Sequence, residues 1–341
     1  MNHFCTYCDS GYAARLLCLH DSLREQGEPF VLHVLCFDAR VPAVIAAVGS
    51  PALVAIPLDE VLRDHPEFAA VRTQRTKAEF FFTATPVLVQ HCFQRLPDAE
   101  RITYLDADLF FFGPASAVFA EQGDASVGIV PHRFPPRLKH LEKNGTYNVA
   151  WVSFRRDAAG LACLAWWRAR CLEWCHDYVD RGRYADQGYL DEFPSRFTGV
   201  RALQHPGIDA APWNIDDARI ERDNGRLQID GQPLLFYHFQ GLRELLRGWF
   251  DPGLLFYSAK MTPELRDLVY RPYLRKLAVM QDRLERELGI VPSRGYHRLG
   301  RGKSWRERCD RAAVRWLLPL YRLLRGQLLR APRRGSLSNA P

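Results

Sequence analysis

Strand-like and helix-like segments alternate over the first 60 residues, and this alternation constrains the fold more than any other feature. Residues 3–8 (HFCTYC), 30–37 (FVLHVLCF) and 52–58 (ALVAIPL) are apolar runs typical of strands. Residues 11–27 and 41–49, which lie between them, carry apolar side chains at helical spacing. Strands that alternate with helices build βαβ units, so the sequence predicts an α/β fold with a mixed, mostly parallel sheet.

Two aspartates lie near the end of the apolar run at residues 101–112 (RITYLDADLFFF), which predicts a strand buried on both faces. In an extended chain Asp106 and Asp108 point to the same face. Two such carboxylates repel each other and are costly to bury, so we expect a divalent cation to compensate them. Ligands of open α/β sheets bind at the carboxyl ends of the strands, where Mg²⁺ or Mn²⁺ would be held by one or two carboxylates and substrate phosphates.

The Asp-x-Asp pattern also has two alternative interpretations. One is a capping or salt-bridged pair at a strand end. The second is a phosphatase of the haloacid-dehalogenase type, in which the first Asp is a nucleophile. That class carries the pattern near the N-terminus, followed by Thr or Val, whereas Asp106 lies far along this chain and Leu109 follows the pattern.

The rest of the chain continues the alternation. Residues 77–96 predict a helix before the Asp-x-Asp strand, residues 124–132 and 145–156 predict further strands, and residues 158–182 predict a long helix. We see no internal repeat and no low-complexity linker before about residue 290. The simplest division is one catalytic domain over residues 1–260, followed by a helical C-terminal extension over residues 261–341.

Cysteine usage indicates a reducing compartment. The nine cysteines are an odd number, and several lie inside apolar runs, where a free thiol behaves as a small hydrophobic residue. Cys5/Cys8 and Cys171/Cys175 have spacings seen in zinc sites, but neither pair has a matching second pair. With no signal peptide and no apolar stretch near the roughly 20 residues of a membrane span, we expect a cytoplasmic protein.

The positive charge of the chain is concentrated near its end. Residues 301–334 hold eleven Lys/Arg and two Asp/Glu, a local charge of +9, although the whole chain carries +7. Their apolar residues recur at helical spacing, which predicts a basic amphipathic helix drawn to an anionic membrane surface. A helix that packs on the domain is the alternative. No nucleic-acid motif accompanies the patch, so we expect no nucleic-acid partner.

Residues 6–23 (TYCDSGYAARLLCLHDSL), followed by residues 104–113 (YLDADLFFFG), resemble the nucleotide-sugar glycosyltransferases of the Rossmann-like, D-x-D type with a GT-A fold. The similarity is closest to family 8, the retaining galactosyl- and glucosyltransferases that include lipopolysaccharide-building enzymes, and it covers roughly residues 1–260. It implies metal-dependent transfer of a hexose from a nucleotide-diphosphate sugar, expected to be a UDP-sugar. The acceptor would be a glycan or a lipid-linked sugar in bacterial-type surface polysaccharide synthesis, at the inner face of the cell membrane.

The resemblance also implies roles for single residues. Asp9 and Tyr12 fall on the positions that hold the nucleoside, and Asp106 and Asp108 fall on the metal-binding D-x-D. His238, in HFQG, falls on the third metal ligand, and an imidazole beside two carboxylates favours Mn²⁺ over Mg²⁺.

Three further positions concern the transferred sugar, and a fourth is structural. Asn148 falls near the transferred sugar, and Asp186 and Gln187, in YADQGYLD, fall beside its anomeric carbon. The family's APWN-like segment places Asn214 in a structural role.

The chain departs from the family where basic residues are expected to face the diphosphate. Thr83 and Glu244 occupy those positions, so we expect Lys77 and Arg243 or Arg247 to bind the diphosphate. The same departures keep an alternative open, in which the chain is a catalytically degenerate protein that binds a sugar nucleotide or acts as a scaffold.

Overall fold

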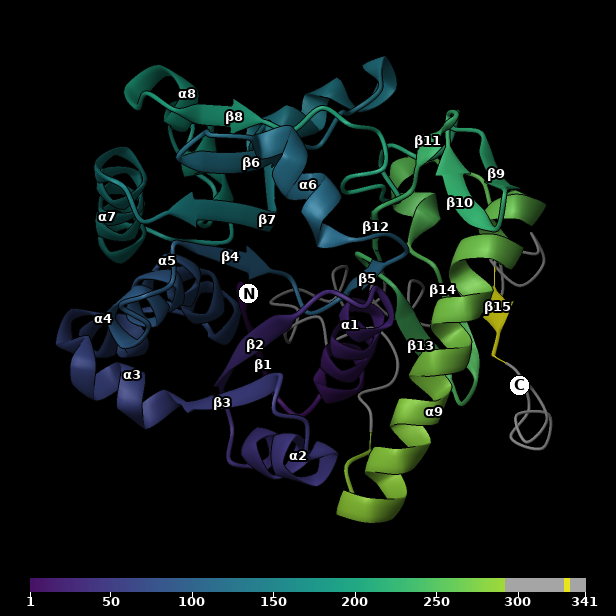
Figure 1. Ribbon diagram of the computed structural model, residues 1–341, viewed down its shortest axis with the longest axis horizontal. Helices are drawn as coiled ribbons and strands as arrows, with labels where there is room; N and C mark the ends of the chain where they lie inside the picture. Colours follow the sequence, from purple (N-terminus) through teal and green to yellow (C-terminus); the bar gives the residue numbers. More distant parts are fainter. Residues whose placement is uncertain (292–327, 332–341) are drawn as a thin grey trace, which may run out of the picture.

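A seven-stranded sheet with the order β3-β2-β1-β4-β7-β6-β8 forms the main sheet of the molecule (Figure 1). The computed structural model describes residues 1–291 and 328–331. Strands β3, β2, β1 and β4 are parallel, β7 is antiparallel to both β4 and β6, and β8 is parallel to β6. The mixed, mostly parallel sheet expected from the sequence is confirmed. Its strands are β1 (Asn2–Cys8), β2 (Phe30–Cys36), β3 (Leu53–Pro57), β4 (Arg101–Leu105), β6 (Val127–Pro131), β7 (Tyr147–Arg155) and β8 (Val200–Ala202).

Helices cover both faces of this sheet and bury a separate hydrophobic cluster on each (Figure 1). Alternate residues of β1 divide between the clusters, with Phe4 and Cys8 on one face and Cys5 on the other, as the period of a strand requires. The first cluster packs on α1 (Ala13–Glu25), α2 (Arg40–Val48), α6 (Ala115–Gln122) and α9 (Arg271–Leu288). The second packs on α3 (Leu58–Asp64), α4 (Pro66–Val71), α5 (Lys77–Arg95), α7 (Ala158–Glu173) and α8 (Phe193–Arg196).

The first turn of α5 also contacts the chain that follows α7. Thr76 and Glu79 form a capping box, in which the Thr76 hydroxyl accepts from the Glu79 N–H and the Glu79 carboxylate accepts from the Thr76 N–H at 2.7 Å. The other Glu79 oxygen accepts from the Asp177 N–H at 3.2 Å and lies 3.0 Å from His176 Nδ1. These contacts hold the chain after Glu173 against α5, so the helix predicted over residues 158–182 is wrong in its last part.

The strand predicted over residues 101–112 is also wrong in its length. β4 ends at Leu105, the Asp-x-Asp residues form a turn, and β5 (Leu109–Phe111) leaves the main sheet. β5 pairs antiparallel with β12 (Phe236–His238), with Leu109 opposite His238 (Figure 1). The separate partner explains the break, because the backbone N–H groups of Phe112 and Gly113 continue this pairing by donating to Leu235 O.

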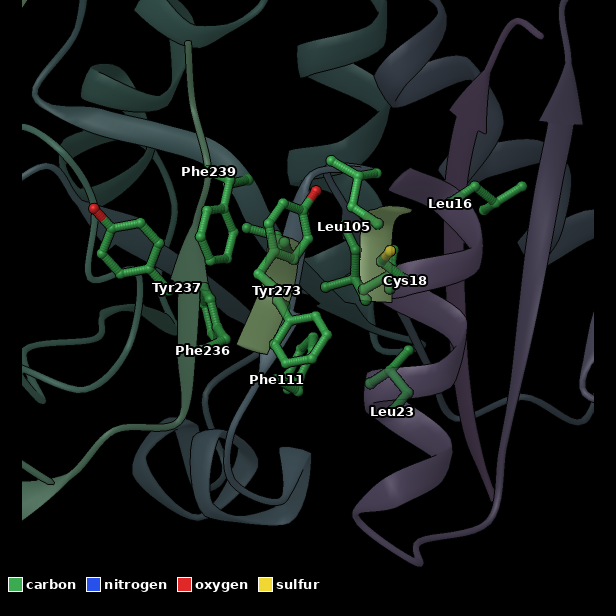
Figure 2. Packing of buried hydrophobic residues seen from close by; sticks show 14 of the residues in the cluster. Leu16, Cys18, Leu23, Leu105, Phe111, Phe236, Tyr237, Phe239 and Tyr273 are labelled. Atoms are coloured by element: carbon green, nitrogen blue, oxygen red, sulfur yellow. The ribbon is translucent and has the colours of Figure 1, made fainter. Parts of the chain in front are cut away.

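The C-terminal elements within the described residues pack on the first half of the chain. α9 lies along α1, and Tyr273 of α9 stacks on Phe239 with ring centroids 3.7 Å apart (Figure 2). No helix within the described ranges has the length and apolar character to span a bilayer. The predicted basic helix over residues 301–334 lies outside the described residues except for residues 328–331. There the prediction is wrong, because β15 (Leu329–Arg330) is a strand that pairs with β14 (Trp249–Asp251).

Short elements complete the described chain. The small sheets contain β9 (Ile220–Asp223), β10 (Arg226–Ile229) and β11 (Gln232–Pro233), and β13 (Arg243–Leu246), β14 (Trp249–Asp251) and β15 (Leu329–Arg330). The 3₁₀ helices are η1 (Arg72–Gln74), η2 (Pro136–Asn144), η3 (Gln187–Glu192) and η4 (Leu254–Tyr257), and η5 (Leu265–Tyr270) is a π-helical turn that leads into α9.

Candidate active site

Two carboxylates and one imidazole converge at the carboxyl end of β4. The Asp-x-Asp turn supplies Asp106 and Asp108, and the pairing of β5 with β12 places His238 opposite Leu109, next to this turn. His238 Nε2 lies 3.3 Å from Asp108 Oδ1 and 3.7 Å from Asp106 Oδ2. One ligand atom from each residue lies within 4.8 Å of the other two. The structure therefore brings together the three side chains that were expected to bind a metal.

The charges of this group are strongly coupled. Burial raises the pKa of Asp106 to about 6, helped by the charge of Asp108 and opposed by His238. Burial would also raise the pKa of Asp108, but His238 and Arg15 hold it below its usual value. Burial would lower the pKa of His238, yet the carboxylates of Asp108 and Asp209 raise it well above its usual value. The two carboxylates thus favour a positive charge at this point.

A divalent cation fits this donor set. Among the described residues, His238 Nε2 is a buried nitrogen with no hydrogen-bond partner, although it faces both carboxylates. Two carboxylate oxygens and an imidazole nitrogen suit Mn²⁺ better than Mg²⁺, which prefers an all-oxygen shell. Asp106 is the more exposed carboxylate, with its side chain 30% accessible, so the group is open to solvent on that side.

A second group of acidic and histidine side chains has no histidine nitrogen left to bind a metal. The ligand atoms of Glu60, Asp64 and His91 also lie within 4.8 Å of one another. Glu60 is paired with Arg95 and lies 3.1 Å from His91 Nε2, and His91 Nδ1 lies 3.3 Å from His65 Nε2. Both ring nitrogens of His91 are therefore already engaged, so we assign no metal to this group.

Asp186 and Asp106 each accept a hydrogen bond from a buried hydroxyl side chain. Tyr104 donates to Asp106 Oδ1 at 2.8 Å, and Thr85 of α5 donates to Asp186 Oδ2 at 2.7 Å. Asp186 is 4% exposed. Burial, with a smaller contribution from the charge of Asp106, raises its pKa from 3.8 to about 7. Asp186 thus holds a proton more tightly than an ordinary carboxylate.

Gln187 and Asn148 are both held by hydrogen bonds. The Gln187 amide donates to Asn144 O at 2.9 Å. Asn148 Oδ1 accepts from the Ala150 N–H at 2.7 Å, and its Nδ2 lies 3.0 Å from His132 Nε2. His132 Nδ1 faces Thr146 O at 3.1 Å, so His132 Nε2 is the acceptor of the Asn148 amide. These bonds fix the orientation of both amide side chains.

The residues expected to bind the nucleoside lie where β1 meets α1. Asp9 Oδ2 accepts from Lys77 Nζ at 2.6 Å, so the carboxylate and the substitute cation predicted from the sequence meet directly. Tyr12, at the N-cap of α1, leaves 39% of its surface accessible. The Arg15 guanidinium lies 4.6 Å from the Tyr12 ring centroid and holds the ring by a cation–π contact.

The two arginines expected near the diphosphate differ in their surroundings. Arg243 is an exposed residue at the start of β13, close enough to influence the pKa of Tyr12. Arg247 instead binds Glu285 of α9 at 2.8 Å. Glu244 is buried and accepts from the Gly248 N–H at 2.8 Å and from the Gln281 amide at 3.3 Å. Glu244 thus joins the β13–β14 turn to α9.

Sequence reasoning did not identify Asp209. It is fully buried, and its Oδ1 lies 3.3 Å from His238 Nδ1. Asn214, expected to be structural, accepts from the Ala211 N–H at 2.9 Å and donates to Asp209 O and His132 O, both at 3.0 Å. The neighbouring APWN segment stands out in the sequence, but a single aspartate five residues before Asn214 gives no signal of its own.

Comparison with solved structures returns glycosyltransferases, the class that the sequence resembles. The chain is 17% identical to the galactosyltransferase LgtC in complex with donor and acceptor sugar analogues, over 70% of this chain and 87% of LgtC, with a TM-score of 0.46. It is 13% identical to the glycosyltransferase GlyE of Streptococcus pneumoniae TIGR4, over 86% of this chain and 66% of GlyE, with a TM-score of 0.47. At such identities and TM-scores, the activity of this chain has to be argued from its own site.

Curated proteins give a firmer relationship. No family model matches the chain. The uncharacterized protein YfnD of Bacillus subtilis strain 168 is 29% identical over 286 residues, which are 83% of this chain and 91% of YfnD. The uncharacterized protein YfnF of the same strain is 31% identical over 248 residues, which are 70% of this chain and 81% of YfnF. By this identity and coverage, the chain belongs to the protein family that contains YfnF.

Proposed function

We propose that the protein is a metal-dependent glycosyltransferase that moves a hexose from a nucleotide-diphosphate sugar, a UDP-sugar in the first instance, to a hydroxyl of its acceptor. The observation that carries this proposal is the convergence of Asp106, Asp108 and His238 at the carboxyl end of β4. Nucleotides bind at this edge of α/β sheets. Asp9, at the end of the neighbouring strand β1, supplies a polar group for a nucleoside.

Different residues of the proposed site would bind the metal, the nucleoside and the diphosphate. Asp106, Asp108 and His238 would hold Mn²⁺, which neutralises negative charge on the departing diphosphate. Asp9 accepts a hydrogen bond from a base N–H or a ribose hydroxyl, and the exposed face of Tyr12 stacks on the base. Lys77 and Arg243 are cations at the same edge and bind diphosphate oxygens.

Asp186 and Gln187 complete the proposed site on the sugar side. Asp186 is coupled to Asp106 and is fixed by Thr85, so its carboxylate is held in one position. When ionised, it stabilises positive charge that develops at the anomeric carbon. The Gln187 amide, anchored on Asn144 O, and Asn148 contribute hydrogen-bonding groups for sugar hydroxyls. We propose transfer with retention, in which the acceptor attacks from the face of the leaving group.

The acceptor in this proposal is a glycan or a lipid-linked sugar used in surface polysaccharide synthesis. The support is the +9 charge of residues 301–334, which would draw the enzyme to an anionic membrane surface. The protein would then work in the cytoplasm, at the inner face of the membrane, where a lipid-linked acceptor is within reach.

One observation favours the second candidate, a degenerate protein that binds a sugar nucleotide without transferring the sugar. Glu244 occupies a position where the resembled family carries a basic residue, and here its carboxylate is used to join the β13–β14 turn to α9. In this alternative the nucleotide sugar binds and no acceptor is glycosylated.

Calorimetric titration tests the proposal. UDP and several UDP-sugars are titrated into the wild type, Asp108→Ala and the control Asp124→Ala, with and without Mn²⁺. Asp124 is fully exposed, at the start of the loop before β6. We expect binding that requires Mn²⁺ in the wild type and the control and that is lost in Asp108→Ala. If no nucleotide binds the wild type, with GDP and dTDP included, the proposal is wrong.

Turnover separates the two candidates. With Mn²⁺ and a UDP-sugar, a transferase moves the sugar slowly to water or faster to added acceptor sugars, and UDP is released in both cases. Asp186→Ala abolishes this release. Metal-dependent binding without any UDP release, across acceptors of both glycan and lipid-linked type, would favour the degenerate protein.

A further inference from the structure

Asp209 is a carboxylate beside His238 to which the proposed metal site assigns no role. It is 0% exposed, and neither of its carboxylate oxygens has a hydrogen-bond partner among the described residues. Its backbone also has φ +54°, in the left-handed region that L-residues other than Asn and Asp adopt rarely. Buried carboxylates without donors are rare because desolvation destabilises them. We therefore expect Asp209 to have a function that compensates for the desolvation of its carboxylate.

The backbone around Asp209 is fixed from several sides. The Asn214 amide donates to Asp209 O at 3.0 Å, and Arg133 NH2 donates to the same oxygen at 3.3 Å. The next residue, Ala210, accepts from the His238 N–H at 2.8 Å and forms a bridge with Tyr237 of β12. The segment is therefore tied directly to the strand that carries His238, and its side chain is aimed at one place.

That place is the back of the His238 ring. Asp209 Oδ1 lies 3.3 Å from His238 Nδ1, and His238 Nε2 faces Asp106 and Asp108 on the opposite side of the ring. Trp213 packs edge-on against the same ring, with centroids 5.3 Å apart and an interplanar angle of 86°. The imidazole is thus held between a carboxylate behind it and two carboxylates in front of it.

We propose that Asp209 is a positioning residue for the metal ligand His238. A histidine that binds a metal through one nitrogen must carry its proton on the other, and a carboxylate that accepts this proton fixes both the tautomer and the ring orientation. In the metal-loaded protein Asp209 Oδ1, which lies 3.3 Å from His238 Nδ1 here, would accept from Nδ1–H and leave the Nε2 lone pair for the cation. The inference rests on the metal site proposed above and adds a residue that does not itself contact metal or substrate.

The neighbouring His132 does not orient the His238 ring. Its Nδ1 faces Thr146 O at 3.1 Å, and its Nε2 lies 3.0 Å from the Asn148 amide. Both of its ring nitrogens are engaged away from His238. Within the described residues, Asp209 is the carboxylate that lies within ion-pair distance of His238 Nδ1.

Binding of Mn²⁺ alone, without nucleotide, tests the inference. Free Mn²⁺ is measured by electron paramagnetic resonance for the wild type, Asp209→Asn and Asp209→Leu, and circular dichroism reports folding. Loss of a carboxylate behind a histidine ligand weakens metal binding by roughly 10- to 100-fold. We expect that loss for Asp209→Leu and a smaller one for Asp209→Asn, whose amide oxygen still accepts from Nδ1–H.

Two control variants help to distinguish failure of the proposed metal site from failure of the inference about Asp209. Asp251→Asn changes another buried carboxylate, which accepts from the Gly253 N–H at 3.1 Å, and should leave Mn²⁺ binding unchanged. Asp108→Ala should abolish it. If the wild type binds no Mn²⁺, the proposed metal site is wrong and this inference falls with it. If the wild type binds Mn²⁺ and a folded Asp209→Leu binds it equally well, only the inference about Asp209 is overturned.

A measurement on the wild type covers the case in which Asp209→Leu does not fold. With ¹⁵N-labelled histidine and diamagnetic Zn²⁺ in place of Mn²⁺, the ring nitrogen shifts of His238 report which nitrogen carries the proton. A proton on Nδ1 in the metal-loaded protein supports the proposal. A proton on Nε2 would overturn it.

Discussion

At the scale of single residues, neighbouring carboxylates of one site have different proton affinities. Asp108 lies against His238 and near Arg15, which hold its pKa below the usual value. Burial raises the pKa of Asp106 to about 6 and that of Asp186 to about 7. Groups whose environments separate their pKa values in this way are suited to different roles, and here Asp108 is the carboxylate most ready to bind a cation.

Asp186 gives a prediction about stability and pH. In the folded protein its pKa is about 7, and the ordinary value is 3.8, so the folded state binds the proton more tightly. The free energy of unfolding therefore falls as pH rises between these values, by up to about 1.4 kcal/mol per pH unit. Asp186→Asn removes this effect, since it carries no charge. With chelator present, the Tm advantage of Asp186→Asn over the wild type should be larger at pH 8 than at pH 5, and an equal difference at both would contradict the assignment.

The Asp9–Lys77 pair gives a prediction about binding. The Lys77 side chain is 71% exposed, and exposed ion pairs contribute little to stability. Lys77→Ala should leave the Tm nearly unchanged but weaken binding of UDP with Mn²⁺ by about tenfold, which corresponds to about 1.4 kcal/mol. Lys139→Ala is the matched control, because Lys139 is also exposed and also paired, with Glu142 at 2.6 Å. Equal Kd values for the two variants would remove Lys77 from the nucleotide site.

The residues that the sequence could indicate were those with a local pattern. Asp106 and Asp108 stand out by their spacing in an apolar run, and His238 was found only through resemblance to a family. Asp209 was missed because its function depends on a contact with His238, 29 positions further along the chain. A buried ion-pair contact between distant residues leaves no local trace in one sequence.

At the scale of elements, the predictions succeeded where one segment determines its own structure. β1, α1, β2, α2 and β3 follow the order read from the first 60 residues, because helical and strand periods are local. The break between β4 and β5 could not be read in the same way. The apolar run continues through both, and the break depends on pairing with β12, which lies far along the chain.

α9 supports the strand that carries His238, and this gives a third prediction. Tyr273 stacks on Phe239 (Figure 2). The backbone N–H of Phe239 donates to Asp108 O at 3.0 Å. Tyr273→Ala leaves a cavity beside that strand and should cost about 3–5 kcal/mol of unfolding free energy. Mn²⁺ binding should weaken as well.

Tyr273→Phe is the control for that cavity. Within the described residues the Tyr273 hydroxyl is buried without a hydrogen-bond partner, so its removal should leave stability unchanged or raise it. Denaturant unfolding of both variants checks the pair. A large loss of stability in Tyr273→Phe would show that the hydroxyl, rather than the ring, supports the strand.

At the scale of the whole molecule, charge is unevenly distributed. The chain carries +7, and residues 301–334 alone carry +9, so the remainder is close to neutral. Such a distribution supports the proposal of a membrane-associated segment attached to a neutral catalytic body. The structure describes residues 328–331 of this segment, and within them Leu329 and Arg330 pair with β14.

Because of that pairing, substitution tests the segment better than deletion. Changing Arg306, Arg311, Arg315, Arg322 and Arg325 to Gln should leave the folded domain intact. At about 1 kcal/mol per residue, the five substitutions should weaken binding to phosphatidylserine-containing vesicles by roughly several thousandfold. Sedimentation with these vesicles, and with neutral phosphatidylcholine vesicles as a control, checks the result. Unchanged sedimentation with anionic vesicles would contradict the membrane proposal.

The pairing of β5 with β12 has a consequence for synthesis on the ribosome. The Asp-x-Asp turn is translated early, but its histidine partner and the strand that aligns it come about 130 residues later. A nascent chain that has exposed only the segment up to β5 would hold two carboxylates and no complete site. Metal capture would therefore begin only after residue 238 has left the exit tunnel, so that the cation binds a chain whose main sheet has already been made.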